Sequence, residues 1–241
     1  MRFAIIGYGK MGKTIEALAI ERGHSIGAII ELDSPKSITS LKKEDIDVAI
    51  EFTNPEVAFK NLSTLAEKNI PAVSGTTGWL DRYDELCSLN KKYESGFLYA
   101  SNFSVGVNIF FELNRLLAKL MSPLNDYNPS MEEIHHIHKL DAPSGTAITL
   151  ANDLIDRHAN KTKWENKETL STEILGIKSK RIDEVPGTHS ISYSSTIDQI
   201  SITHEAYSRQ GFALGAILAA EWMDGKQGIY SMEDVLNLKN L

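Results

Sequence analysis

The sequence predicts an α/β protein with two domains, and three observations support this prediction. Short apolar runs alternate with helix-forming stretches over residues 2–100, which is typical of a mostly parallel sheet covered by helices on both faces. Longer and more polar strands, rich in Thr, Ser and Ile, follow from residue 130 and indicate a second α/β domain with an open, mixed sheet that is largely antiparallel. Helix-forming segments return after residue 210, and we expect them to pack on the first domain.

The first domain is expected to contain five strands with helices between them. The strands are predicted over residues 2–6, 24–30, 47–52, 70–74 and 96–100, and the helices over residues 13–22, 55–68 and 79–93. Gly23 is suited to follow the end of the first helix, and Pro55 to begin the second. Since crossovers between parallel strands are right-handed, this order predicts a parallel sheet with helices on both sides.

The second domain is expected to begin with a long helix over residues 107–121. A further helix is predicted over 147–159, a surface loop over 160–167, and strands over 130–138, 172–181, 189–195 and 199–206. Helices over 211–223 and 232–238 follow. The expected boundaries are 1–105 with 208–241 for the first domain, and 106–207 for the second.

Composition narrows the class of partner. The 241 residues carry a formal charge of −7, which argues against nucleic acid or an anionic membrane as the main partner. No apolar stretch reaches the roughly 18 residues that span a bilayer. Cys87 is the only cysteine, so the chain cannot form an internal disulfide. We therefore expect a cytoplasmic protein that binds a small molecule.

A glycine-rich loop follows the first predicted strand directly. The segment Gly7-Tyr8-Gly9-Lys10-Met11-Gly12 lies between that strand and a helix, which is the position where the pattern G-x-G-x-x-G indicates a dinucleotide-binding turn. Gly7 permits the tight turn, Gly9 lets a pyrophosphate approach the backbone, and Gly12 lets helix and strand pack closely. The helix N-terminus favours the phosphates. A tight turn without a ligand, or a mononucleotide or flavin site, remains an alternative to a dinucleotide site.

Glu31 lies 19 residues beyond Gly12, at the end of the second predicted strand. A carboxylate there accepts hydrogen bonds from a ribose diol and repels a 2′-phosphate unless a base offsets it. The next residue is Leu32, and the nearest base is Lys36. The cofactor is therefore expected to be NADH or NADPH, with NADH favoured.

Ligands bind at the carboxyl ends of the strands in such a sheet. The segments Ser74–Trp79 and Ala100–Ser104 lie there and offer small residues, hydroxyls and the rings of Trp79 and Phe103 as an apolar wall for a nicotinamide. Ordinary turn chemistry is the alternative, and the segment 52–55 is more ambiguous. The full set of expected cofactor contacts is Gly7, Gly9, Lys10, Met11, Gly12, Glu31, Phe52, Thr53, Gly75, Thr76, Thr77, Ser101, Asn102 and Phe103.

The run from His135 to Ala147 contains three histidines and Lys139, followed by a Pro-Ser-Gly-Thr turn. One interpretation is a metal site, because His136 and His138 would share one face of a strand. Another is a set of structural histidines. The third is a catalytic site for an anion, with an imidazole or Lys139 as the acid. We favour the third and expect no metal, because Lys139 repels a cation.

The turn after the histidines is suited to a carboxylate. The Ser144 hydroxyl and the N–H groups of Gly145 and Thr146 stand at the start of a predicted helix, where backbone donors lack partners. Pro143 restricts the turn.

Together these residues resemble the signature of the 4-hydroxy-tetrahydrodipicolinate reductase family, also called dihydrodipicolinate reductases. The resemblance rests on the pattern Glu-x-x-His-His-x-x-Lys-x-Asp-Ala-Pro-Ser-Gly-Thr-Ala, quoted for the segment from Glu132 to Ala147, and on shorter motifs in family order along nearly the whole chain. These motifs lie at residues 7–12, 75–78, 102–108, 187–189, 202–204, 208–213 and 232–241.

The resemblance implies a Rossmann-like first domain and a second domain that builds a homotetramer. It implies NAD(P)H-dependent reduction of a cyclic imine dicarboxylate to tetrahydrodipicolinate, in the diaminopimelate route to lysine. His135 and Lys139 are then the general-acid candidates, and the sequence does not decide between them. The implied substrate contacts are His136, Lys139, Ser144, Gly145 and Thr146.

The chain departs from the family pattern at two positions. Many relatives carry arginines where this chain has Leu32 and Asn54, and this difference also favours NADH. A nucleotide-binding sensor without turnover, or a different dehydrogenase on the same fold, are the competing hypotheses.

Overall fold

The computed structural model describes residues 1–31, 37–208 and 210–240, and the chain divides into two compact units. The first unit consists of Met1–Val105 and Gln210–Leu241, and the second consists of Gly106–Arg209. Within the described ranges, no helix has both the length and the apolar character needed to cross a bilayer.

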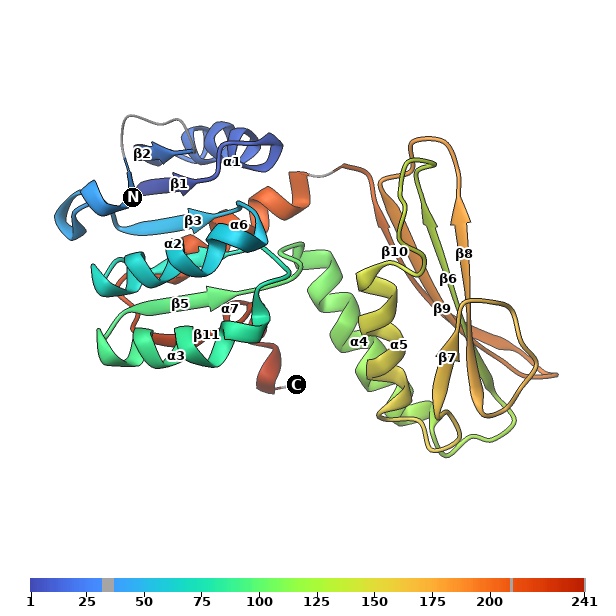
Figure 1. Cartoon of the computed structure of the whole chain (residues 1–241). Coiled ribbons are helices and arrows are strands. Elements are labelled where there is room, and N and C mark those ends of the chain that lie inside the picture. Colours follow the sequence, from blue (N-terminus) through green and yellow to red (C-terminus); the bar gives the residue numbers. More distant parts are fainter. Residues whose placement is uncertain (32–36, 209, 241) are drawn as a thin grey trace. The chain divides into compact units, whose positions relative to one another are not determined.

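The first unit contains a six-stranded sheet in which every neighbouring pair is parallel, in the order β11-β5-β4-β3-β1-β2 (Figure 1). The strands are β1 (Arg2–Ile6), β2 (Ser25–Ile30), β3 (Val48–Glu51), β4 (Ala72–Ser74), β5 (Gly96–Tyr99) and β11 (Gly228–Tyr230). The chain runs from β1 to β2 on one side and then returns to β3 on the other. This reversal of direction places a topological switch point at β1 and β3, where ligands bind in such sheets.

Helices cover both faces of this sheet because side chains along each strand alternate between two cores. Phe3 and Ile5 of β1 pack in the core beneath α1 (Lys10–Glu21) and α6 (Gln210–Trp222). Ala4 and Ile6 face the opposite core, beneath α2 (Pro55–Glu67) and α3 (Tyr83–Lys92). The late helix α6 packs in the first unit, and its alanines lie in the first core.

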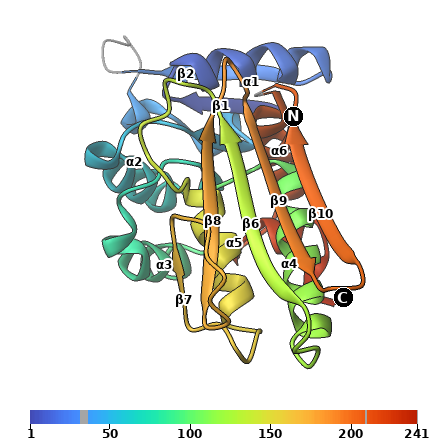
Figure 2. The ribbon, with the colours of Figure 1, turned by 90° about the vertical axis from the view of Figure 1, so that its right-hand side faces the viewer.

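The second unit contains a five-stranded sheet in the order β10-β9-β6-β8-β7 (Figure 2). The strands are β6 (Asn128–His135), β7 (Lys163–Glu165), β8 (Ile174–Arg181), β9 (Gly187–Ser194) and β10 (Gln199–Ala206). β6 pairs antiparallel with β9 and parallel with β8, and β8 pairs parallel with β7. β9 also pairs antiparallel with β10, so the sheet is mixed as expected, and its two antiparallel pairings are longer than its two parallel ones.

Two helices, α4 (Val105–Met121) and α5 (Gly145–Ile155), cover one face of this sheet. Phe110 and Leu154 meet Ile177 and Tyr193 in the core between them. On the other face, Ser190 and Ser192 form hydrogen bonds with hydroxyls of β10. Along β6, odd-numbered residues from Pro129 to His135 are buried and even-numbered residues are more exposed.

Several element boundaries differ from the prediction. β6 ends at His135 rather than at residue 138, and the expected loop over 160–167 contains the short strand β7. The helix predicted over 79–93 begins with a 3₁₀ turn at Leu80–Arg82, and the last predicted helix is reduced to α7 (Met232–Val235) followed by a 3₁₀ turn at Leu238–Asn240. β11 was not predicted. Both missed strands have three residues and do not lie within longer apolar runs, so no pattern in the sequence marks them.

Candidate active site

The glycine loop of the first unit has the geometry that its sequence predicts. Gly7 has a positive φ of 91°, and a Cβ there would lie 2.0 Å from the Phe52 carbonyl oxygen. A Cβ on Gly12 would lie 2.3 Å from the Gly7 carbonyl oxygen, so this glycine permits close packing of α1 on the turn. Gly9 caps α1, and no atom lies within 4 Å of its Cβ position. The backbone at Gly9 is therefore open to an approaching ligand.

A pocket of about 510 Å³ opens beside this loop. Gly7, Gly9, Glu31, Phe52 and Thr53, all among the expected cofactor contacts, line it. Six further lining residues were not among the expected contacts: Ile6, Tyr8, Ile30, Asn54, Val57 and Asn61. Leu32 and Lys36, on which the preference for NADH partly depends, lie outside the described residues.

The two aromatic rings expected to form a wall for the nicotinamide are not available for that purpose. Phe103 and Trp79 are each 2% exposed and lie in the two cores of the first unit. The Trp79 indole N–H donates to the Thr76 carbonyl oxygen at 2.6 Å. The expectation of an aromatic wall is therefore wrong, because both rings are needed for packing.

A buried carboxylate, Glu51, lies at the end of β3 and joins the two loops that follow β3 and β4. Its Oε1 accepts hydrogen bonds from the Thr53 N–H at 3.1 Å, the Thr53 hydroxyl, and the Thr76 hydroxyl at 2.9 Å. Its Oε2 accepts from the Ser74 hydroxyl at 2.6 Å. Burial raises the pKa of Glu51, and these hydrogen bonds act in the opposite direction. Sequence reasoning missed this residue because an acid at a strand end looks like an ordinary exposed position.

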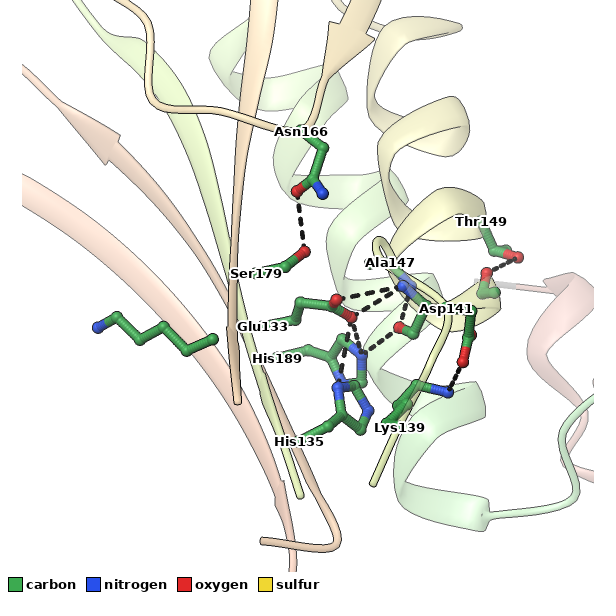
Figure 3. Close-up of polar contacts among 12 residues, drawn as sticks. Glu133, His135, Lys139, Asp141, Ala147, Thr149, Asn166, Ser179 and His189 are labelled. Atoms are coloured by element: carbon green, nitrogen blue, oxygen red, sulfur yellow. Dashed lines mark hydrogen bonds and ion pairs between the residues drawn. The ribbon is translucent and has the colours of Figure 1, made fainter. Parts of the chain in front are cut away.

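His135, the first histidine of the run, lies beside a second buried carboxylate, Glu133 (Figure 3). Glu133 and His135 both point to the helix-covered face of β6, and His189 stands directly opposite Glu133 on β9. The His135 Nδ1 lies 3.4 Å from the Glu133 Oε2, and the His189 Nε2 lies 3.8 Å from the same oxygen. Strand pairing therefore brings His189 beside Glu133 and His135, which lie two residues apart on β6.

The turn at Ser144 is attached to this cluster. The Ser144 N–H donates to both Glu133 oxygens, at 3.1 and 3.2 Å, and its hydroxyl lies 3.2 Å from the His189 Nε2. The same hydroxyl accepts the Ala147 N–H and caps α5. Gly145 is exposed and Thr146 is half-buried in the first turn of the helix. The N-terminal donors of α5 are thus positioned by a side chain of the sheet.

Lys139 lies in the loop between β6 and α5. Its ammonium group lies 2.8 Å from the Asp141 Oδ1, and Arg181 of β8 fixes the loop by donating to the carbonyl oxygens of Lys139, at 3.2 Å, and of Asp141. Arg181 also lies 3.4 Å from the Glu133 Oε1. Sequence reasoning missed Arg181, which stands opposite His135 only through the pairing of β6 with β8.

His136 and His138 do not share a strand face, because β6 ends before them. His136 is half-buried in the loop, and His138 is exposed with its Nε2 3.5 Å from Glu184. The histidine pair on which the metal interpretation depended is therefore not formed as a strand pair.

Another group, Glu133, His135 and His189, brings three potential ligand atoms within 4.8 Å of one another. Both Glu133 oxygens already accept the Ser144 N–H, however, and the guanidinium of Arg181 adds positive charge beside them. This arrangement favours an anionic guest over a cation.

The pKa values in this cluster follow from burial and neighbouring charges. Burial lowers the pKa of His189 to about 4, assisted by His135, and burial also lowers the pKa of His135 against the opposing effect of Glu133. For Glu133, burial acts to raise the pKa, but hydrogen bonds from Ser144 and Ser179 outweigh it and hold the pKa below its ordinary value. In the absence of a ligand, the carboxylate is therefore ionised and the two imidazoles are largely neutral at pH 7.

Comparisons with known proteins agree on one family. The family model described as "Dihydrodipicolinate reductase, N-terminus" matches residues 1–103, and "Dihydrodipicolinate reductase, C-terminus" matches residues 106–236. A 4-hydroxy-tetrahydrodipicolinate reductase of Christiangramia forsetii is 51% identical over 237 residues, which cover 98% of each chain. One of Neisseria meningitidis serogroup C is 32% identical, covering 93% of this chain and 85% of that protein.

Solved structures show the same fold. A dipicolinate-bound dihydrodipicolinate reductase from Paenisporosarcina sp. TG-14 matches with a TM-score of 0.76 at 23% identity, covering 96% of this chain and 97% of that one. A probable dehydrogenase from Thermotoga maritima matches with a TM-score of 0.58 at 10% identity, covering 98% of this chain and 92% of that one. At these identities the likeness describes the fold alone.

Proposed function

The chain belongs to the dihydrodipicolinate reductase family, and on this basis we propose that it reduces 4-hydroxy-tetrahydrodipicolinate to tetrahydrodipicolinate with NAD(P)H. This reaction is a step of the diaminopimelate route to lysine. The observation that carries the proposal for the site is the turn Ser144-Gly145-Thr146, held by Glu133 and His189 at the start of α5 beside His135. Such a helix start binds carboxylates.

The residues of the first unit fit a dinucleotide. Gly7 and Gly12 leave no room for side chains, while the open backbone at Gly9 and the N-terminus of α1 suit a pyrophosphate. The exposed carboxylate of Glu31 lines the same pocket and suits a ribose diol. When bound, a reduced nicotinamide supplies the hydride.

The remaining expected contacts are Lys10 and Met11 in the first turn of α1, and Gly75, Thr76, Thr77, Ser101, Asn102 and Phe103 at the strand ends. They stay in the proposal, with Phe103 limited to its backbone because its ring is buried.

The second unit is proposed to hold the dicarboxylate. Lys139 supplies a positive charge, and Gly145 and Thr146 supply backbone donors for a carboxylate. His136 lies in the loop beside Lys139 and completes the proposed contact set. Because the site is otherwise nearly balanced in charge between Glu133, Arg181, Lys139 and Asp141, a bound dianion favours protonation of the neighbouring imidazoles.

Reduction of the ring also requires a proton at carbon. His135 and Lys139 are the two groups positioned to deliver it, and an acid of this kind contributes roughly 10²–10⁴ in rate. His135 is buried and tuned by Glu133, whereas the ammonium of Lys139 is already paired with Asp141. The proposed arrangement is that Lys139 orients a carboxylate and His135 donates the proton.

The experiment is to follow oxidation of NADH or NADPH with the condensation product of pyruvate and aspartate semialdehyde. Wild type should turn over only when this product is supplied. Lys139→Ala and His135→Ala should each lose about 10²-fold or more in turnover. If both variants keep near-normal turnover, the site assignment is wrong. A panel of other keto and imino acids separates this activity from that of a different dehydrogenase.

We also propose a preference for NADH, which rests on Glu31 and on the absence of an arginine at positions 32 and 54. Titration of the protein with each cofactor tests it, and tighter binding of NADPH would contradict it. A homotetramer and a cytoplasmic location are proposed on the family resemblance. Sedimentation at equilibrium checks the first, and fractionation of cells checks the second.

A further inference from the structure

We propose that Glu133 is a positioning residue of this reaction, holding the imidazole of His135 and the carboxylate-binding turn at Ser144 in a single arrangement. The inference rests on the proposed function and goes one step further, because it assigns a role to a side chain that touches neither substrate nor cofactor in that proposal. Glu133 and the groups around it all belong to the second unit.

The first argument concerns burial. The Glu133 side chain is fully buried, and a buried charge costs several kcal/mol unless it is paired and hydrogen-bonded. Its neighbour Glu132 is oriented differently, because successive side chains of a strand point to opposite faces. Glu132 is half-buried at 34% exposure and lies 2.6 Å from the ammonium of Lys180. Of this acidic pair, only Glu133 faces the site.

The second argument concerns which groups Glu133 joins. Both of its oxygens accept the Ser144 N–H, and one of them also lies 3.4 Å from the His135 Nδ1. The hydrogen bonds from the Ser144 N–H are charge-assisted and therefore stronger than neutral ones. The His135 Nδ1 lies within ion-pair distance of the carboxylate and makes no hydrogen bond to any described residue. The proposed proton donor and the proposed substrate turn are therefore attached to one carboxylate, so a displacement of Glu133 alters both.

The third argument concerns the position of the mobile proton on His135. A carboxylate can only accept a hydrogen bond, so it favours a proton on Nδ1 and stabilises the imidazolium. The proton available for transfer is then the one on Nε2. A Cβ at position 187 would lie only 3.1 Å from that atom, so a side chain in place of Gly187 would crowd Nε2.

The charged and titratable groups around His135 come from each neighbouring element. They are Glu133 of β6, Arg181 of β8, His189 of β9, and Lys139 and Asp141 of the following loop. Of these, the carboxylates favour the imidazolium and the cations oppose it. Glu133 is the closest carboxylate and the one that is fully buried, so it has the largest influence among the acids.

The test compares Glu133→Gln with Glu132→Gln, a matched control that makes the same chemical change one residue away on the opposite face. Glutamine keeps the size of glutamate and can still accept the Ser144 N–H through one oxygen. Its NH₂ group then faces donors, including the Nδ1–H of an imidazolium. We measure the Kd of pyridine-2,6-dicarboxylate by calorimetry, the Kd of the reduced cofactor, and the pH profile of kcat.

Glu133→Gln should weaken binding of pyridine-2,6-dicarboxylate by about tenfold or more. The Ser144 N–H would then have one uncharged oxygen as acceptor in place of the two carboxylate oxygens. The substitution should move the alkaline limb of the kcat profile to lower pH by about one to three pH units, because the imidazolium loses its partner. Cofactor affinity should stay at the wild-type value. Glu132→Gln should match wild type in all three measurements. A merely structural role would not move the pH profile.

Wild-type dicarboxylate affinity and an unshifted pH profile in folded Glu133→Gln would overturn the proposal, as would equal effects in Glu132→Gln. If Glu133→Gln does not fold, Glu133→Asp takes its place. It keeps the charge but shortens the side chain, so it should bind dicarboxylate more weakly, and unchanged binding overturns the proposal. If the wild-type protein neither binds pyridine-2,6-dicarboxylate nor turns over, the proposed function fails first, and the role of Glu133 fails with it.

Discussion

Replacement of Glu51 should separate the need for a hydrogen-bond acceptor from the need for a charge. Glu51→Ala removes the acceptor of three hydroxyls, and two of these, on Ser74 and Thr76, are buried. The Thr53 N–H keeps a second acceptor, the Thr76 hydroxyl oxygen at 2.8 Å. A buried polar group without a partner costs about 1–3 kcal/mol, so the two buried hydroxyls together should lower the free energy of unfolding by about 2–6 kcal/mol.

Glu51→Gln should be far milder. Its oxygen can serve the two threonines, while its NH₂ group donates to the Ser74 hydroxyl, which can rotate to accept. Burial raises the pKa of Glu51, so the folded protein binds this proton more tightly than the unfolded chain does. The contribution of Glu51 to stability is therefore present at low pH and is lost as the pH rises through the folded-state pKa. Because glutamine does not ionise, the stability of Glu51→Gln relative to wild type should increase as the pH rises.

Urea unfolding between about pH 5 and pH 8 measures both effects. Circular dichroism follows the whole chain, and tryptophan fluorescence adds a local signal because the Trp79 indole donates to the Thr76 carbonyl. The reasoning is refuted if Glu51→Gln destabilises as much as Glu51→Ala. It is also refuted if Glu51→Gln loses stability relative to wild type as the pH rises.

Three further predictions concern the glycine loop, the acid response and the core. Gly9→Ala should fold normally, since its Cβ would meet no atom within 4 Å, but it should weaken cofactor binding. Gly12→Ala should destabilise the protein, because its Cβ would lie 2.3 Å from the Gly7 carbonyl oxygen. Thermal melting and cofactor titration distinguish these outcomes. Burial lowers the pKa of His189 to about 4, so its contribution to stability is present above the unfolded-state pKa of about 6.5 and is lost as the pH falls toward 4. His189→Gln should therefore flatten the decline in stability over that range, and an unchanged slope would contradict this account. Leu154→Ala should cost about 2–5 kcal/mol in urea unfolding, because Leu154 is fully buried beneath the second sheet.

Sequence alone predicted most of the elements that have a local signal. The glycine loop was predictable because the G-x-G-x-x-G pattern lies directly between a strand and a helix. The structure shows that a Cβ on Gly7 or Gly12 would collide with a backbone carbonyl oxygen. The late helix α6 was predictable from its apolar composition. The strands β7 and β11 were not, because these short strands do not lie within longer apolar runs, whereas the equally short β4 does.

The site was only partly predictable because strand pairing assembles it. The sequence around Glu133 does not indicate that His189 lies opposite Glu133, or that Arg181 lies opposite His135. One local signal was available, since Met131, Glu133 and His135 alternate and the apolar Met131 marks the inward face. The expected role of the Phe103 ring was wrong because chemical suitability for a flat ligand says nothing about whether a ring is already buried in the core.

The first unit is assembled from two separate stretches of chain, with α6 supplying Ala213, Ala216, Ile217, Ala219 and Ala220 to the core beneath its sheet. During synthesis, therefore, the strands β1 to β5 leave the ribosome before α6 can join α1 on the face that these two helices cover. The continuous second unit can acquire its core in the meantime, since all of its strands and helices precede residue 210. Most of the first unit is therefore synthesised before the second, yet the first unit completes its fold after it. Until α6 emerges, the apolar surface that α6 covers is the one that a chaperone would have to shield.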